Sequence, residues 1–146
     1  MKSLYIMIIT IVLTFTGCGQ GPSMSINTAK SHLEKEGFTP INLRYSMNFP
    51  RTEMPWICIC AKEDNQYITV INSKKDFKQV QIGTEQYLSL EEIQDKLVSL
   101  GYEKNEYLIN NLNVDLSEND QLYWFFPVES SGSLLFFSLD GKRINH

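Results

Sequence analysis

Cysteine is the residue of this chain whose spacing most directly suggests chemistry. Cys58 and Cys60 lie two positions apart in a predicted β-strand, so their side chains should point to the same face. Their Cβ atoms would then be about 6.5–7 Å apart, which is too far for a disulfide unless the strand carries a bulge. A redox pair or a metal site would need further His, Cys or carboxylate groups beside them. We therefore expect two buried, small side chains, because free cysteine is among the most buried residue types.

Signatures of an enzyme are weak in the rest of the chain. His32 neighbours the apolar stripe of a predicted helix and fits a partly buried position better than a general base, and His146 is the last residue. The sequence contains neither a GxSxG nucleophile motif nor a phosphate-binding glycine loop. The acidic pairs at 63–64 and 91–92 fall at a hairpin tip and a first helical turn, where carboxylates have structural roles. We predict no catalytic residue, no cofactor and no metal site, and therefore not an enzyme.

The charge balance argues against one large class of partner. The chain carries a formal net charge of −4, and its first segment contains Lys2 but no acidic residue. A nucleic-acid-binding protein would show a basic patch, whereas like charges form no long run here. An apolar fraction of 42% is ordinary for a globular chain. We expect no nucleic-acid partner.

The first residues have the pattern of a secretory leader. Lys2 precedes the apolar run 4–15, which is shorter than the roughly 20 residues of a membrane span but suits a signal-peptide core. The run ends in Thr-Phe-Thr-Gly-Cys at 14–18, which resembles a bacterial lipobox with Phe15 where Leu is usual. The resemblance implies cleavage before Cys18, lipidation of its sulfur, and anchoring at the extracytoplasmic face of the cell membrane. The alternative is an ordinary secretory leader that contains a cysteine.

Two helix signals recur at an offset of 64 residues. The first begins at a capping residue, Ser25, and ends at Gly37; the second begins at Ser89 and ends at Gly101. Ser89 and Glu92 form a possible capping box. The apolar stripes of the two helices are Ile26, Ala29 and Leu33, and Leu90, Ile93 and Leu97.

Strand signals follow each helix in the same order. Alternating apolar residues predict a strand at 41–47 and another at 112–116, and hairpins are predicted at 56–72 and 122–139. The segment 74–83 either adds a short strand or simply leads to the second helix. Because Pro127 cannot donate a ladder hydrogen bond, we expect its strand to lie at an edge or to carry a bulge.

These elements predict an α+β fold built from a duplicated helix-strand-strand-strand unit. We expect antiparallel sheets with helices packed on one face, the sheets lying side by side or stacked through their apolar faces. The expected segments are a signal peptide at 1–17, the lipidated cysteine and a tether at 18–24, and units at 25–83 and 84–146.

Aromatic residues supply the candidate binding surface. If Trp124, Phe126 and Val128 point into the core, strand alternation places Tyr123 and Phe125 on the opposite face. Exposed rings there would suit a protein or peptide partner. The alternative is that both faces are covered, since aromatic strand residues usually belong to a core.

The leader, the Ala-x-x-x-Leu-x-x-x-Gly helix at 29–37 and a Trp-containing hairpin that ends in Asp-Gly-Lys-Arg-Ile at 140–144 together resemble PepSY-like domains. The resemblance would cover about residues 25–144. PepSY-like domains are small α+β modules, often in tandem, and related in architecture to the β-lactamase inhibitory protein. The resemblance implies non-catalytic binding of another envelope protein or peptide, with modulation of an envelope peptidase as its sharper form. The alternative is a lipoprotein that binds a solute or cell-wall ligand in a pocket between the two units.

Overall fold

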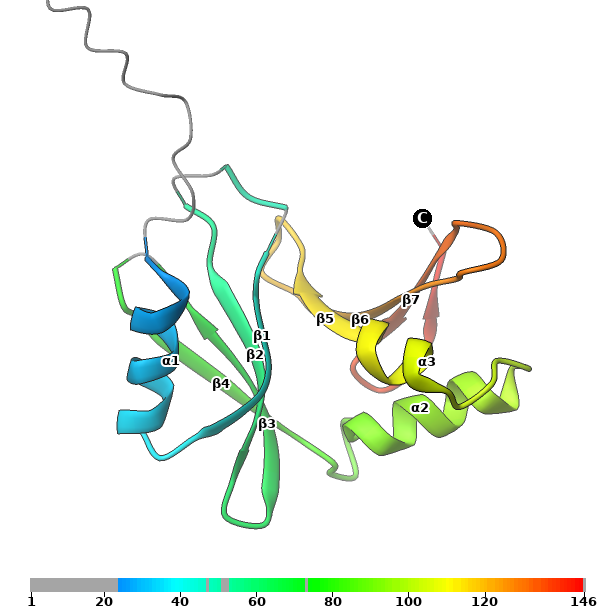
Figure 1. The fold of residues 1–146 in the computed structure, drawn as a ribbon, viewed down its shortest axis with the longest axis horizontal. Helices are drawn as coiled ribbons and strands as arrows, with labels where there is room; N and C mark the ends of the chain where they lie inside the picture. Colours follow the sequence, from blue (N-terminus) through cyan, green and yellow to red (C-terminus); the bar gives the residue numbers. More distant parts are fainter. Residues whose placement is uncertain (1–23, 47, 51–52, 73, 146) are drawn as a thin grey trace, which may run out of the picture.

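The computed structural model describes residues 24–46, 48–50, 53–72 and 74–145. The predicted leader with Cys18, Met47 of the first predicted strand, and His146 lie outside the described residues. The described part is an α+β fold with two four-stranded antiparallel sheets and three helices (Figure 1).

Each half of the described chain is a helical segment followed by four strands in sequential order. The first half contains α1 (Ile26–Lys35), β1 (Thr39–Tyr45), β2 (Trp56–Lys62), β3 (Asn65–Ile71) and β4 (Phe77–Ile82). The second contains α2 (Leu90–Ser99), α3 (Glu106–Asn111), β5 (Asn113–Leu116), β6 (Leu122–Pro127), β7 (Leu134–Ser138) and β8 (Arg143–Ile144). The strands pair in the orders β1-β2-β3-β4 and β5-β6-β7-β8.

The prediction of three strands per unit was wrong, because each sheet has a fourth. β4 arises from the segment 74–83, for which a strand was one of two predictions, and β8 adds two residues after the last predicted hairpin. The short helix α3 was not predicted; the side chain of its N-cap residue Asn105 accepts a hydrogen bond from the Leu108 amide at 3.1 Å.

Pro127 lies neither in an edge strand nor at a bulge, contrary to expectation. It is the last residue of β6, which pairs with β5 on one side and β7 on the other. The Val128 amide donates to the Ser133 carbonyl at 2.8 Å, so the nitrogen of Pro127 faces the β5 side. β5 begins at Asn113, opposite Phe125, and therefore ends before it reaches the proline. No ladder hydrogen bond is lost.

The helix starts follow the predicted caps. The Ser25 side chain accepts from the Thr28 amide, and Ser89 and Glu92 form the capping box. Ala29 and Leu33 of α1 are buried as predicted, but Ile26 is 51% exposed. Met24, two residues earlier and just before the N-cap, is buried instead, and its carbonyl accepts a 2.8 Å hydrogen bond from the Trp56 indole.

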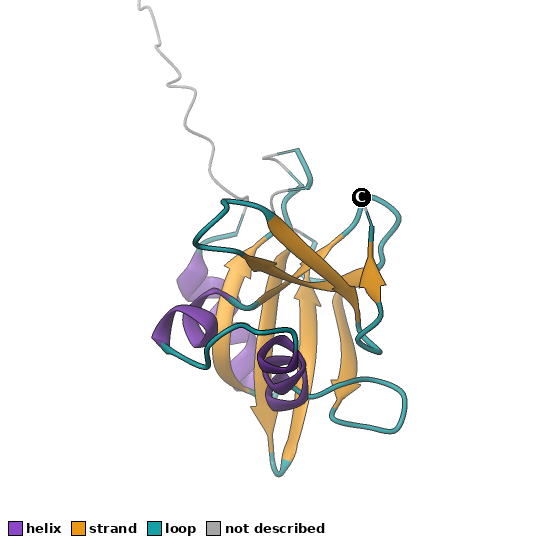
Figure 2. Ribbon diagram, turned by 90° about the vertical axis from the view of Figure 1, so that its right-hand side faces the viewer, coloured by secondary structure: helices purple, strands orange, loops and turns teal. Residues whose placement is uncertain are grey.

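The first sheet is the central layer of the molecule, because both its faces are covered. α1 packs on one face through a core that contains Met24, Ala29, Leu33, Phe38, Trp56, Cys58, Cys60 and Ile71. The other face contributes Ile57, Ile59, Ile68, Val70 and Ile82 to the larger core. The strands of the second sheet run across this face, with α2 beside them (Figure 2).

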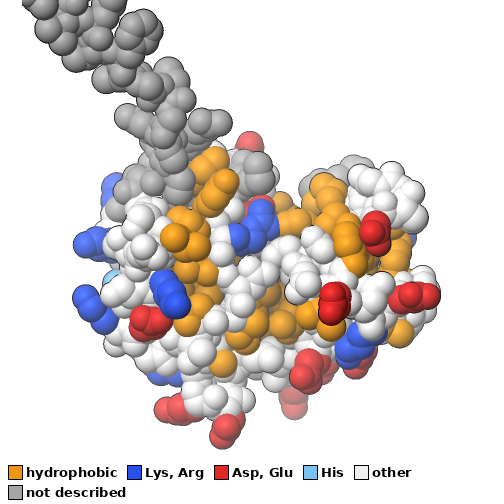
Figure 3. Space-filling view, in the orientation of Figure 1, with side chains coloured by type: hydrophobic (Ala, Val, Ile, Leu, Met, Phe, Trp, Pro, Cys, Tyr) orange, Lys and Arg blue, Asp and Glu red, His pale blue; other side chains and the backbone are white. Residues whose placement is uncertain are grey.

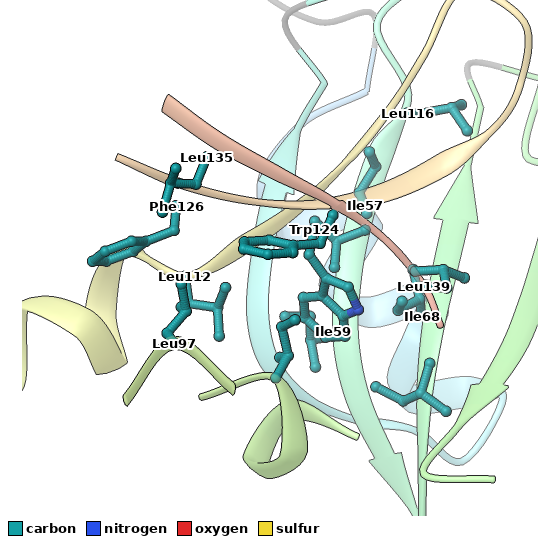
Figure 4. Packing of buried hydrophobic residues seen from close by; sticks show 14 of the residues in the cluster. Ile57, Ile59, Ile68, Leu97, Leu112, Leu116, Trp124, Phe126, Leu135 and Leu139 are labelled. Carbon is teal, nitrogen blue, oxygen red and sulfur yellow. The ribbon is translucent and has the colours of Figure 1, made fainter. Parts of the chain in front are cut away.

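The larger core joins the two halves. Trp124 lies near its centre, close to Ile57, Ile59 and Ile68 of the first sheet (Figure 4). The second half adds Ile93, Leu97, Leu108, Leu112, Val114, Leu116, Phe126, Val128, Leu135, Phe137 and Leu139. Burying each such side chain stabilises the fold by about 1.5–3 kcal/mol before entropy is counted. Of the two predicted sheet arrangements, the stacked one is therefore observed.

Candidate functional site

The two predicted partner-binding residues lie on the face of β6 that points away from the core. Trp124, Phe126 and Val128 are buried, as the predicted alternation requires, while Tyr123 and Phe125 are half-buried. The three helices pack elsewhere: α1 lies on the far side of the first sheet, and α2 and α3 contribute to the core beneath Trp124. No described helix therefore covers Tyr123 and Phe125.

A neighbouring strand extends this surface. Phe136 of β7 pairs with Phe125 in the sheet register, and its ring meets that of Tyr123 edge to face at 5.7 Å between centroids. Leu134 at the start of β7 is 50% exposed. We call Tyr123, Phe125, Leu134 and Phe136 the outer aromatic face. The space-filling view shows the molecule hollowed between the first half and the β6–β7 hairpin (Figure 3).

The edge strand of the first sheet borders the outer aromatic face. The guanidinium carbon of Arg44 lies 4.7 Å from the ring centroid of Phe125, and its Nη2 lies 3.5 Å from Oδ2 of Asp115. Asp115 is buried, and its Oδ1 accepts hydrogen bonds from the Ser46 hydroxyl at 2.5 Å and from the Leu116 amide at 2.8 Å. The carboxylate thus has three partners, as a buried charge requires.

The same border holds the phenol of Tyr123. The side-chain amide of Asn48 donates hydrogen bonds to Tyr123 Oη at 2.7 Å and to the Leu116 carbonyl at 2.9 Å. Burial is the main reason that the pKa of Tyr123 is raised, with the nearby Asp115 charge acting in the same direction. The phenol therefore keeps its proton near neutral pH, and its O–H can donate to a bound partner.

We call the contacts between the chain at 42–48 and the chain at 113–123 the polar seam. A fifth contact, from the side-chain amide of Asn42 to Asn113 Oδ1 at 2.6 Å, continues it. The seam was not predicted from the sequence. The sequence pattern that could have indicated the seam is a set of polar residues that alternate with the apolar residues of the predicted strand: Asn42, Arg44, Ser46 and Asn48.

A second candidate site is a cavity of about 570 Å³ between the two halves. Its apolar lining comes from both sheets and from the β1–β2 connection: Phe49, Pro55, Ile68, Val70, Val80, Leu116 and Leu122. Its polar and charged lining is Glu53, Asn72, Lys74, Asp76, Lys78 and Asp120. Lys78 Nζ lies 4.0 Å from Asp120 Oδ2, and this ion pair connects β4 to the β5–β6 turn. The alternative interpretation of the sequence expected a pocket between the halves.

Cys58 and Cys60 belong to the structural core between α1 and the first sheet. Both are buried free thiols, which confirms their predicted burial. The Cys60 thiol lies 3.5 Å from the Tyr67 carbonyl and 3.8 Å from the Thr69 hydroxyl. The hydrogen bond with Cys60 and burial both raise the pKa of Cys58, so that thiol stays protonated and poorly nucleophilic.

His32 is half-buried on α1, and its ring meets Phe77 edge to face at 5.9 Å. Within residues 24–46, 48–50, 53–72 and 74–145, no cluster of three or more His, Cys, Asp or Glu side chains could hold a metal ion. No helix among the described residues is long and apolar enough to cross a membrane. Comparison of the chain with protein-family models, curated proteins and solved structures finds no match.

Proposed function

We propose that the chain is a lipoprotein, anchored through Cys18 at the extracytoplasmic face of the cell membrane, that binds another envelope protein or peptide without catalysis. The outer aromatic face is the proposed binding surface. Large aromatic rings with one polar tip are the side chains that most often dominate protein interfaces. Tyr123, Phe125 and Phe136 supply three aromatic rings on adjacent strands, and the hydroxyl of Tyr123 is their one polar tip.

The observation that carries this proposal is that the rings are held in place before a partner binds. Phe136 packs against Tyr123, Asn48 fixes the phenol, and the Arg44 guanidinium lies over Phe125. Binding therefore costs little side-chain entropy, which favours affinity. Both halves contribute to this arrangement, because Arg44 and Asn48 at the border come from the first half and the rings come from the second.

The proposed anchor keeps the protein near the bilayer. The expected tether ended at residue 24, but Met24 is buried in the core beside α1, so only residues 19–23 are left to serve as the tether. Five residues span at most about 18 Å when fully extended. A partner that is itself attached to the membrane or the cell wall would meet the protein in this layer.

We also propose that the two halves are copies of one unit of the PepSY-like kind, and that the partner is an envelope peptidase whose activity the protein modulates. Both halves place a helical segment before a four-stranded sheet with sequential strand order. Trp56 and Trp124 are buried in the second strand position of their sheets, Trp56 on the side of α1 and Trp124 in the core that α2 shares. These likenesses support the proposed duplication.

The cavity between the halves supports a second candidate function, the binding of a solute or cell-wall ligand. At about 570 Å³, it is within the roughly 300–1,000 Å³ of small-molecule pockets. Its mixed lining offers an apolar floor with charged groups of both signs around it. In this case binding would depend on Val70 and Leu122 rather than on Tyr123 and Phe125.

The experiment that separates these functions is crosslinking of the full-length protein in living cells, followed by capture and mass spectrometry. A variant with Tyr123→Ser and Phe125→Ser removes the central rings of the outer aromatic face. Ile109→Ser is a matched control, because Ile109 is 50% exposed but lies on α3. We expect one protein to be captured by the parent and the control and lost with the double variant, whose folding is checked by thermal unfolding. Equal capture by all three would contradict the proposal.

A further inference from the structure

β4 forms an edge of the first sheet. In the described part of the chain it pairs with β3 alone, so the N–H and C=O groups along its other side, at alternate residues, have no strand partner. Such an edge is a template for a further strand. Its six residues, Phe77–Ile82, are long enough to pair with a short peptide.

The cavity lies beside this edge and shares its side chains. Lys78 and Val80 pair with Val70 and Ile68 of β3, and all four line the cavity. Strand alternation directs Phe77, Gln79 and Gln81 to the opposite face, which α1 covers in part. An added strand would therefore place every second side chain at the cavity and the others on the α1 side.

We propose that β4 binds an extended peptide as a fifth, antiparallel strand, with an apolar side chain entering the cavity beside Val80 and an acidic side chain beside Lys78. This inference goes beyond the proposed function: it adds a second binding site, distinct from the outer aromatic face, and names the peptide class that the site takes. Because the added strand runs antiparallel, its sequence in the N-to-C direction reads apolar, any residue, acidic. A peptide uses both features at once, whereas an apolar small molecule would leave the strand edge unpaired.

The cavity is lined by three carboxylates, Glu53, Asp76 and Asp120, as well as by Lys74 and Lys78, so the acidic residue is favoured by the lysines along the start of β4 and not by the cavity as a whole. Residues 74–78 carry three lysines and one aspartate in a chain whose net charge is −4. Lys78 faces Asp120 at 4.0 Å, but both side chains are mostly exposed, so this ion pair is weak and leaves the ammonium free to take a second carboxylate. Opposite charges directly across two strands stabilise their pairing. Lys74, at the rim of the cavity, adds a second cation.

The test uses the full-length protein in detergent micelles and a fluorescent nine-residue peptide, Thr-Thr-Val-Thr-Leu-Thr-Glu-Thr-Thr, followed by anisotropy. We expect saturable binding that is lost when the threonines flanking Leu are N-methylated, because methylation removes the edge hydrogen bonds. Lys78→Glu should lower the affinity for this peptide by roughly fivefold. The variant should instead bind a peptide with Lys in place of Glu more tightly.

A matched pair of variants locates the site. Val80→Asp should abolish binding because it places a charge beside the apolar side chain, whereas Gln79→Asp on the other face of the same strand should leave binding nearly unchanged. The proposal would be overturned if the peptide did not bind, or if the N-methylated peptide bound equally well. It would also be overturned if Lys78→Glu kept the parent's preference for the Glu peptide. A stable dimer that Val80→Asp dissociates would overturn it as well, since a second copy would then occupy the edge. Each outcome leaves the proposed function intact if Tyr123 and Phe125 still determine partner capture.

Discussion

The guanidinium of Arg44 lies over the ring of Phe125, 4.7 Å from its centroid, and so connects the edge of one sheet to the outer face of the other. The same side chain reaches Asp115, whose carboxylate also accepts the Ser46 hydroxyl. The proposed binding surface therefore depends on how the two halves are held together. Changes in the polar seam should affect both stability and binding.

The Ser46–Asp115 hydrogen bond provides the first prediction. Asp115→Ala should lower the free energy of unfolding by about 2–4 kcal/mol, because it leaves Ser46 and Arg44 without their buried partner. Ser46→Ala should cost about 1–2 kcal/mol. Urea denaturation of both variants and of the double variant would show strong coupling between the two residues. Additive losses would mean that the hydrogen bond contributes little.

The turn between β7 and β8 gives a second prediction. Gly141 has a φ of +81°, and a Cβ at this position would clash with the Leu88 side chain. Gly132 has a φ of +65°, but a Cβ there would meet nothing within 4 Å. Gly132→Ala should cost about 1 kcal/mol, and Gly141→Ala should cost about 1–3 kcal/mol more through overpacking. Thermal unfolding that ranks the two variants equally would show that the turn does not pack on Leu88.

The same turn should respond to acid. Hydrogen bonds from Lys142 and Ser138 hold the pKa of Asp140 at about 2, below its ordinary value. A lowered pKa means that the stabilisation from Asp140 is present above the ordinary value of 3.8 and is lost as the pH falls through about 2. NMR titration of the side-chain carboxyl should follow this low pKa and return toward the ordinary value in Lys142→Ala. Titration near the ordinary value in the parent would contradict the hydrogen bonds from Lys142 and Ser138 to this carboxylate.

Anchoring is tested by Cys18→Ala. The proposed lipobox requires the sulfur of this residue for the thioether, so the variant should leave the membrane fraction or accumulate with its leader attached. Fractionation and intact mass spectrometry would follow both the location and the lipid mass. Cys58→Ala is a suitable control, because Cys58 is buried in the core of the first half. Unchanged membrane association of Cys18→Ala would defeat the lipoprotein proposal.

Local sequence signals predicted much of the fold. Capping residues at Ser25 and Ser89 located the helices, and strand alternation placed Trp124 and Phe126 in the core. Such signals work because each depends on a few neighbouring residues. β4 was harder to predict, since its edge position leaves Lys78, Gln79 and Gln81 exposed and weakens the apolar pattern.

The candidate sites could be predicted only in part. The outer face of β6 follows from alternation, so Tyr123 and Phe125 could be named from the sequence. Asp115, however, has its hydroxyl partner 69 residues away, at Ser46, and the cavity is lined by segments from both halves. No local pattern encodes which sheet faces meet, so contacts across the seam required the folded structure.

The most direct test of the proposed function places a photo-crosslinking phenylalanine analogue at position 134 of the full-length protein in living cells. Leu134 is half exposed on the outer aromatic face, and position 109 on α3 serves as the matched control. We predict a single crosslinked partner at position 134, absent at position 109 and lost when Tyr123 and Phe125 are changed to Ser. Identical crosslinks at both positions, or none at position 134, would contradict the proposal that this face binds a partner.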